Sequence, residues 1–130
     1  MTPTEMFHHM HALVRVYDIR VVDCYAPDGV LELPFAPPPL QRRYVGRDAI
    51  RDVLAPRYAI RRAAGLTLGG YRNLVIHETR DPQVIVAEFE VESDGRQLAF
   101  AQVYRVVDGL IALQRDYFDS YAMAERLRVS

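Results

Sequence analysis

Acidic residues on two predicted strands are the part of this sequence best suited to chemistry. Glu88 and Glu90 alternate with apolar residues in segment 84–92, and Asp116 stands between apolar and aromatic residues in segment 110–118. If these side chains enter one enclosed apolar space, crowding and lost hydration raise the pKa of at least one carboxyl. A carboxyl with a pKa near neutrality can give and take protons as a general acid–base catalyst.

A plainer alternative exists for each acid. The alternation of Glu88, Glu90 and Glu92 is typical of a strand face that meets solvent, and periodicity alone favours that interpretation. We assign Glu92, beside a predicted turn, to solvent. A buried Asp116 also has a structural explanation, because an arginine or a backbone donor can satisfy its charge.

Histidine and cysteine give weaker signals. His8 and His11 share a predicted helix face, but no third ligand accompanies them, so we predict exposed histidines and no metal site. His77 lies on a predicted strand, either as a hydrogen-bonded structural residue or as a proton donor facing a pocket. Cys24 has no Cys–His–Asn setting around it and is predicted to be a small buried hydrophobe.

The composition narrows the function classes. The chain has 130 residues, 50% of them hydrophobic and 25% charged, which predicts one domain spanning residues 1–130. All 16 basic residues are arginines, so mechanisms that need a lysine amine are excluded, and the net charge of −1 disfavours nucleic-acid binding. No apolar run is long enough to span a membrane, no signal peptide is visible, and the single cysteine suits a reducing compartment. We therefore expect a cytoplasmic protein.

The first half of the chain is predicted to be mainly helical. Thr2 and Glu5 form a capping box before apolar residues at helical spacing, and Asp18 caps a second, short helix. The turn signal at residues 26–29 ends that helix, and a strand follows at residues 30–35. A third helix begins at residues 46–48, and Pro56 is expected to break or kink it.

The second half changes to a period of two. It predicts four strands at about 71–79, 84–92, 97–107 and 110–118, joined by short turns as antiparallel neighbours, and a helical tail follows. Helices that cover one sheet face leave the other apolar face in need of a cover. We expect a two-fold homodimer through this outer face. The residues assigned to it are Ile85, Ala87, Phe89, Val91, Val103 and Leu113.

The segments and their order resemble the nuclear transport factor 2-like superfamily and, within it, the SnoaL-like group. The resemblance is carried by residues 26–37, by GRDAI at 46–50, by DGLI at 108–111 and by RDYFD at 115–119. It implies an α+β fold shaped as a cone, in which N-terminal helices pack inside a strongly curved antiparallel sheet around an apolar pocket. Members include cyclases, isomerases, dehydratases, hydrolases and binding domains, so the fold alone does not name the reaction.

The C-terminal half is similar to limonene epoxide hydrolases, which also end a strand in Arg-Asp-Tyr-Phe-Asp. On that resemblance Asp116 matches a catalytic aspartate, and Glu90 takes the place of the second acid. The counterparts of Glu88 and Glu90 in those enzymes face the cavity. Glu88 stands where those enzymes have an arginine that bridges the acids. Residues 31–33 stand where they hold the attacking water with a tyrosine and an asparagine. SnoaL-type cyclases also place an acid/base aspartate on the last strand, in the position of Asp116.

The residues and the resemblance together predict a cofactor-free acid–base enzyme acting on a small, mostly apolar metabolite in the cone pocket, of cyclase, isomerase, dehydratase or hydrolase type. Asp116 is the predicted acid/base, and Glu90 and Glu88 share its proton network. The alternative is a non-catalytic small-molecule-binding or chaperone-like domain. The residues predicted to contact the ligand are Tyr17, Leu31, Leu33, His77, Leu98, Phe100, Gln102, Tyr104 and Phe118.

Overall fold

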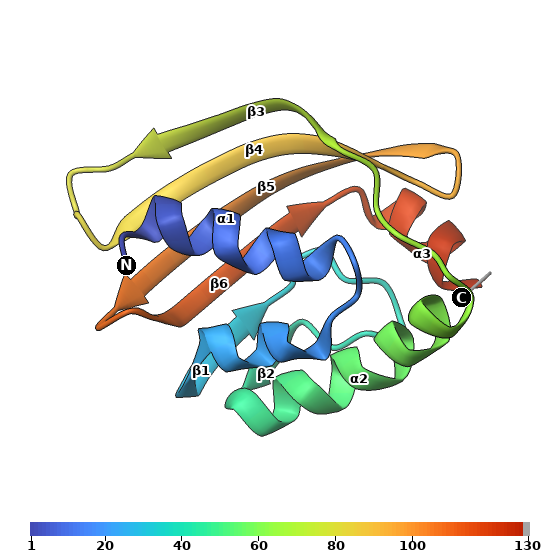
Figure 1. Cartoon of the computed structure of the whole chain (residues 1–130), viewed down its shortest axis with the longest axis horizontal. Coiled ribbons are helices and arrows are strands. Elements are labelled where there is room, and N and C mark those ends of the chain that lie inside the picture. Colours follow the sequence, from blue (N-terminus) through green and yellow to red (C-terminus); the bar gives the residue numbers. More distant parts are fainter. Residues whose placement is uncertain (129–130) are drawn as a thin grey trace.

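A curved six-stranded sheet wraps around the helices and frames the molecule (Figure 1). The computed structural model describes residues 1–128. In chain order its elements are α1 (Pro3–Val14), the 3-10 helix η1 (Ile19–Cys24), β1 (Tyr25–Glu32), β2 (Arg43–Val45), α2 (Arg47–Ala63), β3 (Tyr71–Glu78), β4 (Val84–Ser93), β5 (Arg96–Val107), β6 (Leu110–Phe118) and α3 (Ser120–Arg128). The strand order is β2-β1-β6-β5-β4-β3. The predicted α+β class is confirmed.

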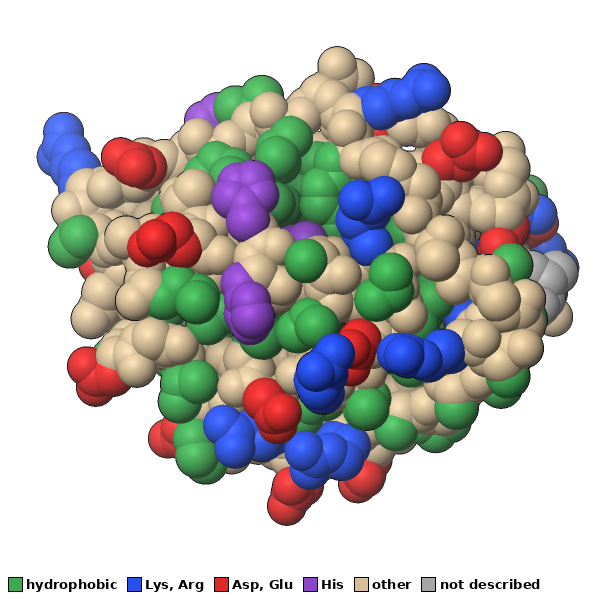
Figure 2. Space-filling view, viewed as in Figure 1, with side chains coloured by type: hydrophobic (Ala, Val, Ile, Leu, Met, Phe, Trp, Pro, Cys, Tyr) green, Lys and Arg blue, Asp and Glu red, His purple; other side chains and the backbone are tan. Residues whose placement is uncertain are grey.

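Local sequence signals set the helix ends. Thr2 and Glu5 form a capping box at the start of α1, and the Asp18 side chain accepts from the Arg20 N–H at the start of η1. Of the two effects predicted for Pro56, a break is wrong: α2 continues through Pro56, which is exposed on the helix. Charged and histidine side chains are scattered over this side of the molecule (Figure 2). Within residues 1–128, no helix is long and apolar enough to cross a membrane.

Two-residue turns and one shift in register set how β4, β5 and β6 pair. Asp94 and Gly95, with φ angles of 55° and 77°, join β4 to β5 and place Ser93 opposite Arg96. Odd-numbered residues of β4 therefore stand opposite even-numbered residues of β5. The Asp108-Gly109 turn joins β5 to β6 and pairs Val107 with Leu110. A shift in register between Arg105 and Val106 then sets even residues opposite even ones, so Gln102 stands opposite Asp116.

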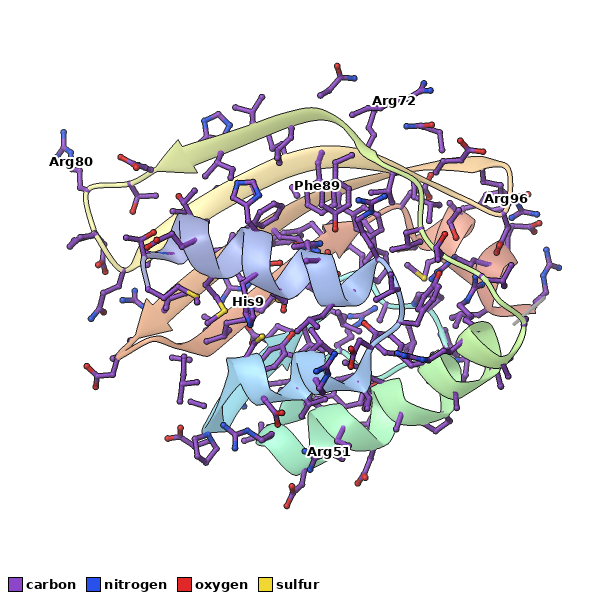
Figure 3. All side chains as sticks on the ribbon, viewed as in Figure 1. His9, Arg51, Arg72, Arg80, Phe89 and Arg96 are labelled. Carbon is purple, nitrogen blue, oxygen red and sulfur yellow. The ribbon has the colours of Figure 1, made fainter. Side chains whose placement is uncertain are left out.

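This register decides which face of the sheet meets the helices. The side chains of Ile85, Ala87, Phe89 and Val91 lie in the core, and Figure 3 shows Phe89 on the helix side of β4. Their predicted place on an outer, dimer-forming patch is wrong. Only Val103 and Leu113 of that set stand on the opposite face, because odd-numbered residues of β5 pair with even-numbered residues of β4 and, here, with odd-numbered residues of β6. The outer face of β4 presents its glutamates instead.

β1 departs most from the sequence prediction. It begins at Tyr25, at the end of the predicted short helix, and includes the predicted turn at 26–29. It runs parallel to β6, so the sheet is mixed rather than wholly antiparallel. A shift in register between Tyr25 and Val30 absorbs the Pro27-containing stretch. A Cβ atom added at Gly29 would lie 2.8 Å from the Ile111 carbonyl oxygen, so close strand approach explains the glycine that resembles a turn signal.

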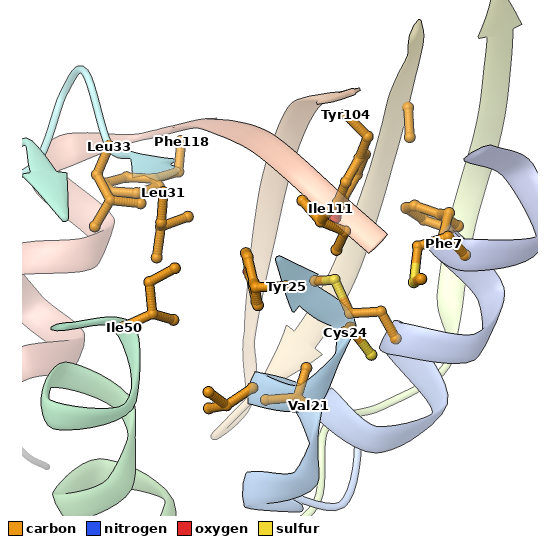
Figure 4. Close-up of a cluster of buried hydrophobic side chains, with 14 of the residues drawn as sticks. Phe7, Val21, Cys24, Tyr25, Leu31, Leu33, Ile50, Tyr104, Ile111 and Phe118 are labelled. Carbon is orange, nitrogen blue, oxygen red and sulfur yellow. The ribbon is translucent and has the colours of Figure 1, made fainter. Parts of the chain in front are cut away.

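The core fills the space between the concave sheet face and the helices. Phe7 of α1, Tyr25 of β1, Ile50 of α2, Tyr104 of β5 and Ile111 of β6 are all fully buried in it. Figure 4 shows Leu31, Leu33 and Phe118 gathered near Ile50, at one end of this cluster. Large side chains from these five elements thus support the strands that carry the polar residues described next.

Candidate active site

Two adjoining cavities lie between the helices and the concave face of the sheet, with volumes of about 180 and 190 Å³. Both are lined by Asp116, Gln102, Tyr58 and Arg126. Apolar residues that complete one or both walls include Met10, Val14, Leu31, Leu33, Leu54, Phe89, Leu98, Phe100, Phe118 and Met123. Among the described lining residues, Asp116 is the only acid. The space therefore suits a small, mostly apolar ligand held against one carboxyl.

The Asp116 carboxyl is poorly hydrated. Its Oδ1 atom is buried and has no hydrogen-bond partner, the one such side-chain oxygen or nitrogen among residues 1–128. Loss of hydration raises the pKa of Asp116 to about 7, and a hydrogen bond from the Gln102 side chain lowers it only in part. Both the carboxylate and the acid are consequently populated near neutral pH, as a group that gives and takes protons requires.

Gln102 is held by buried neighbours on its far side. Its Oε1 accepts from the Tyr104 hydroxyl and lies 3.0 Å from His11 Nε2, while His11 Nδ1 contacts the Tyr71 hydroxyl. Burial lowers the pKa of His11 to about 4, with the Gln102 hydrogen bond opposing and His8 adding to the effect, so the imidazole is neutral at pH 7. Because the amide oxygen is occupied, the amide nitrogen is left to face Asp116.

A second glutamine on the cavity wall is held in the same way. The Tyr25 hydroxyl donates to Gln114 Oε1, and both residues are buried. Burial raises the pKa of Tyr25 well above its usual value, so the hydroxyl keeps its proton and stays a donor. Gln114 stands two residues before Asp116 on the same face of β6, opposite Tyr104.

A cationic cluster borders the same space. Arg126 donates to the Tyr17 hydroxyl at 3.1 Å and to Ser93 Oγ at 3.2 Å, and Arg61 pairs with Asp94 at 3.1 Å. Burial lowers the pKa of Arg126, followed by repulsion from Arg61. Besides the single acid, Arg126 thus lies in the wall of both cavities, and Arg57 lines one of them.

Most residues predicted to contact a ligand do line these cavities. Tyr104 is an exception, since it lies fully buried behind Gln102 and reaches the site only through that side chain. The predicted residues that line one or both cavities are Tyr17, Leu31, Leu33, Leu98, Phe100, Gln102 and Phe118.

Glu88, Glu90 and His77 lie elsewhere, so their predicted place in the pocket is wrong. Glu88 Oε1 accepts from His77 Nε2 at 2.7 Å, and Glu90 Oε2 accepts from the Asn73 amide at 3.0 Å, both on the outer face. The physical reason is the odd-to-even pairing of β4 with β5, which turns Phe89 rather than the glutamates toward Asp116. Among residues 1–128, the hydrogen-bond partners of these glutamates are His77 and Asn73, outside the cavity.

Other residues of the site were missed by the sequence prediction. His11 is 5% exposed rather than on a solvent face, and its position four residues after Phe7 was the available signal. Tyr25 was expected as a core or pocket-wall residue, but in a helix rather than in β1, and its bond to Gln114 was not predicted. Gln114 shares the period-two face of Asp116 and Phe118, a signal that was present but not used. Among residues 1–128, no group of three or more His, Cys, Asp or Glu side chains is placed to hold a metal ion.

Comparison with known protein families identifies the family of this chain. A family model described as the SnoaL-like domain matches residues 8–114. The chain belongs to the SnoaL-like family. An uncharacterised PhzA/B-like protein of Pseudomonas aeruginosa is 31% identical over an alignment of 136 residues, gaps included. The alignment covers 98% of this chain and 91% of that protein. The resemblance to the SnoaL-like group predicted from the sequence is confirmed.

Solved structures agree on the fold. A candidate isomerase of Bacillus subtilis aligns with a TM-score of 0.75 at 21% identity, covering 98% of this chain and 93% of that one. A candidate polyketide cyclase of Pseudomonas putida gives 0.69 at 17% identity, covering 96% and 97%. A phenazine biosynthesis-related protein of P. aeruginosa gives 0.60 at 17% identity, covering 98% and 86%. At these identities the likeness shows the nuclear transport factor 2-like cone fold and nothing finer.

Proposed function

We propose that this SnoaL-like protein is a cofactor-free acid–base enzyme that acts on a small, mostly apolar metabolite, with Asp116 as the acid and base. The observation that carries the proposal is the buried, unpartnered Oδ1 of Asp116 in an apolar cavity. A carboxylate in that setting is a stronger base than in water, because it is poorly hydrated. Its raised pKa also lets it return the proton at neutral pH.

A cyclase or isomerase type of reaction fits this site better than a two-acid hydrolysis. One carboxyl that removes a proton from carbon and returns it elsewhere is sufficient for isomerisation and assists ring closure. Epoxide opening of the kind suggested by the similarity to limonene epoxide hydrolases uses two acids and a held water. Glu90, the expected second acid, bonds Asn73 outside the cavity.

Proton transfer from carbon can be tested without knowing the metabolite. The probe is 2-tetralone, an apolar ketone, whose α-protons exchange with solvent in D2O and are followed by proton NMR. Wild-type protein is expected to accelerate this exchange, and Asp116→Asn is expected to reduce the acceleration about 10²–10⁴-fold. Glu90→Gln is the matched control, since it removes an outer carboxylate and should leave the exchange unchanged.

Equal exchange by wild type and Asp116→Asn would contradict an acid–base role. Retained binding of 2-tetralone in that case would identify the cavity as that of a non-catalytic binding domain, the alternative function. Circular dichroism of each variant establishes that the fold is intact before the rates are compared.

We also propose that two copies of the chain associate through the outer sheet face. That face carries apolar side chains, including Val75 at 48% exposure, Ala101, Val103 and Leu113, next to the charged pairs of β4. Light scattering at micromolar concentration is expected to give the mass of a dimer, and Val103→Asp is expected to give a monomer. A wild-type monomer under these conditions would refute the dimer.

A further inference from the structure

The polar side chains on the concave face of β5 and β6 form a paired arrangement. Gln102 stands opposite Asp116, and Tyr104 stands opposite Gln114. Each glutamine oxygen accepts from a buried tyrosine, Tyr104 for Gln102 and Tyr25 for Gln114. Each amide is thereby locked with its oxygen toward the protein, which leaves the two N–H donors of the amide nitrogen as its free hydrogen-bonding capacity.

The two amides differ in what their nitrogen meets. The Gln102 side chain hydrogen-bonds Asp116 and so serves the carboxyl itself. Gln114 lines the cavity, is 3% exposed to solvent, and has its oxygen occupied. Its nitrogen is the donor left for a ligand. Because Gln114 and Asp116 are two residues apart on one strand face, their Cβ atoms are about 7 Å apart, and one small ligand can touch both.

We propose that Gln114 is a further catalytic residue that donates a hydrogen bond to the carbonyl oxygen of the substrate, and that the substrates are ketones or esters with a proton on the neighbouring carbon. This inference rests on the proposed acid–base function and names its substrate class. Tyr25 is then a positioning residue, which acts through Gln114 by holding its amide oxygen.

The reaction step balances with these two groups alone. The Asp116 carboxylate takes the proton from the carbon next to the carbonyl, and the C–H electron pair becomes a carbon–carbon double bond. The carbonyl π pair moves onto oxygen, where the negative charge is met by the Gln114 N–H. Asp116 then returns the proton to the same or a conjugated carbon, and the carbonyl re-forms. A preorganised donor at the developing oxyanion in an apolar cavity strengthens as charge develops there.

The aromatic alcohol 2-naphthol tests the donor apart from catalysis, because it has the shape of the 2-tetralone enol. Its oxygen can accept from Gln114 while its O–H donates to Asp116. Naphthalene, of the same shape without oxygen, reports apolar packing alone. Fluorescence titration is expected to show tighter binding of 2-naphthol than of naphthalene by the wild type.

Variants at the donor should erase this preference. Gln114→Met keeps the length of the side chain and removes the donor, and it is expected to weaken 2-naphthol binding roughly tenfold, with naphthalene binding unchanged. Tyr25→Phe keeps the ring and frees the amide, and it should reduce the same preference while leaving naphthalene binding intact. If Gln114→Met fails to fold, Tyr25→Phe alone decides. Gln97→Met, at an exposed glutamine of β5, is the matched control.

Exchange of 2-tetralone separates the two proposals. Gln114→Met is expected to slow it about 10²-fold, as loss of one oxyanion donor does. If Asp116→Asn abolishes exchange while Gln114→Met changes neither exchange nor 2-naphthol binding, the acid–base function stands and the role of Gln114 is overturned. If Gln114→Met weakens 2-naphthol binding while Asp116→Asn leaves exchange unchanged, the donor site stands and the acid–base function fails. Equal wild-type affinity for 2-naphthol and naphthalene overturns the inference.

Discussion

The two faces of β4, β5 and β6 carry similar residue types in opposite surroundings. On the concave face, the Asp116 carboxyl lies in a cavity walled by apolar side chains, with one oxygen buried and unpartnered. On the convex face, Glu88 and Glu90 pair with His77 and Asn73 in contact with water. The inner carboxyl has lost its hydration, whereas the outer ones keep theirs.

The difference shows that one residue of register separates a reactive carboxyl from an ordinary one. Glu90 and Phe89 are neighbours in sequence, yet only Phe89 reaches the core because side chains alternate along a strand. Chemistry at this site therefore depends on the turns that set the register as much as on the residue types.

Removing a large side chain from the inner face should have the largest effect on stability. Phe89 is 4% exposed and packs against the rings of Phe7, Tyr71 and Phe100. We expect Phe89→Ala to lower the free energy of unfolding by about 3–5 kcal/mol, measured by urea denaturation. Glu92→Ala on the convex face is the comparison, at an exposed residue of the same strand, with an expected change within about 0.5 kcal/mol. Similar losses in the two variants would show that the faces are not distinct.

Asp116→Asn should stabilise the protein, with a dependence on pH. The folded-state pKa of about 7 exceeds the ordinary value of 3.8, so the folded protein binds the proton more tightly than the unfolded chain does. Below pH 4 the Asp116 side chain is therefore protonated in both states and does not destabilise the folded protein. As the pH rises from 4 to about 7, the unfolded chain loses this proton first, and the folded protein becomes progressively less stable. We expect Asp116→Asn to match the wild type near pH 4 and to exceed it by up to about 4 kcal/mol at pH 8.

Glu90→Gln on the convex face provides the contrast for this measurement. It should change the free energy of unfolding by no more than about 0.5 kcal/mol across the same pH range. A pH-independent effect of Asp116→Asn would show that the Asp116 carboxyl is hydrated in solution, and the distinction between the faces would then lose its chemical meaning.

The sequence predicted the frame of the fold well and the interior of the site less well. Capping residues, period-two alternation and Asp-Gly turns are local signals, so α1 and the four strands from β3 to β6 were recognised. Asp116 was singled out because a carboxyl among aromatic residues is unusual. The pairing of β1 with β6 joins residues far apart in the chain, and no local pattern reveals it.

The wrong face of β4 has a different cause, because the necessary signal was present. A two-residue Asp94-Gly95 turn already requires odd residues of β4 to oppose even residues of β5, which excludes Glu88 and Glu90 from the face of Gln102 and Asp116. The hydrogen-bond partners of Gln102 and Gln114 could not be predicted, because His11 and Tyr25 reach them from other elements through tertiary packing.

His11 should make the inner face sensitive to acid. Burial holds its pKa at about 4, below the ordinary 6.5, so the unfolded chain binds the proton more readily than the folded protein. Stability from the neutral imidazole is complete above pH 6.5 and declines as the pH falls toward 4, by up to roughly 3 kcal/mol. The raised pKa of Asp116 makes the folded protein more stable as the pH falls, which opposes the effect of His11. The loss of stability caused by His11 is therefore expected to be clearest in the Asp116→Asn background.

The matching variants are His11→Gln and His77→Gln. His11→Gln in the Asp116→Asn background should flatten the decline between pH 6.5 and 4, even if it lowers stability at every pH. His77→Gln on the convex face should leave the slope unchanged. If the slope survives His11→Gln, another group is responsible, and the neutral, buried imidazole behind Gln102 would have to be reconsidered.

The smallest expected effect concerns the ion pair of the convex face. His77 and Glu88 side chains are 50% and 58% exposed, so water screens their 2.7 Å contact. A double-mutant cycle with His77→Gln and Glu88→Gln at pH 5.5 is expected to give a coupling energy of about 0.2–1 kcal/mol, and 1 M NaCl should abolish most of it. A coupling well above 2 kcal/mol that resists salt would mean that the convex face is as dry as the concave one. The contrast between Asp116 and the glutamates would then rest on their partners alone, not on hydration.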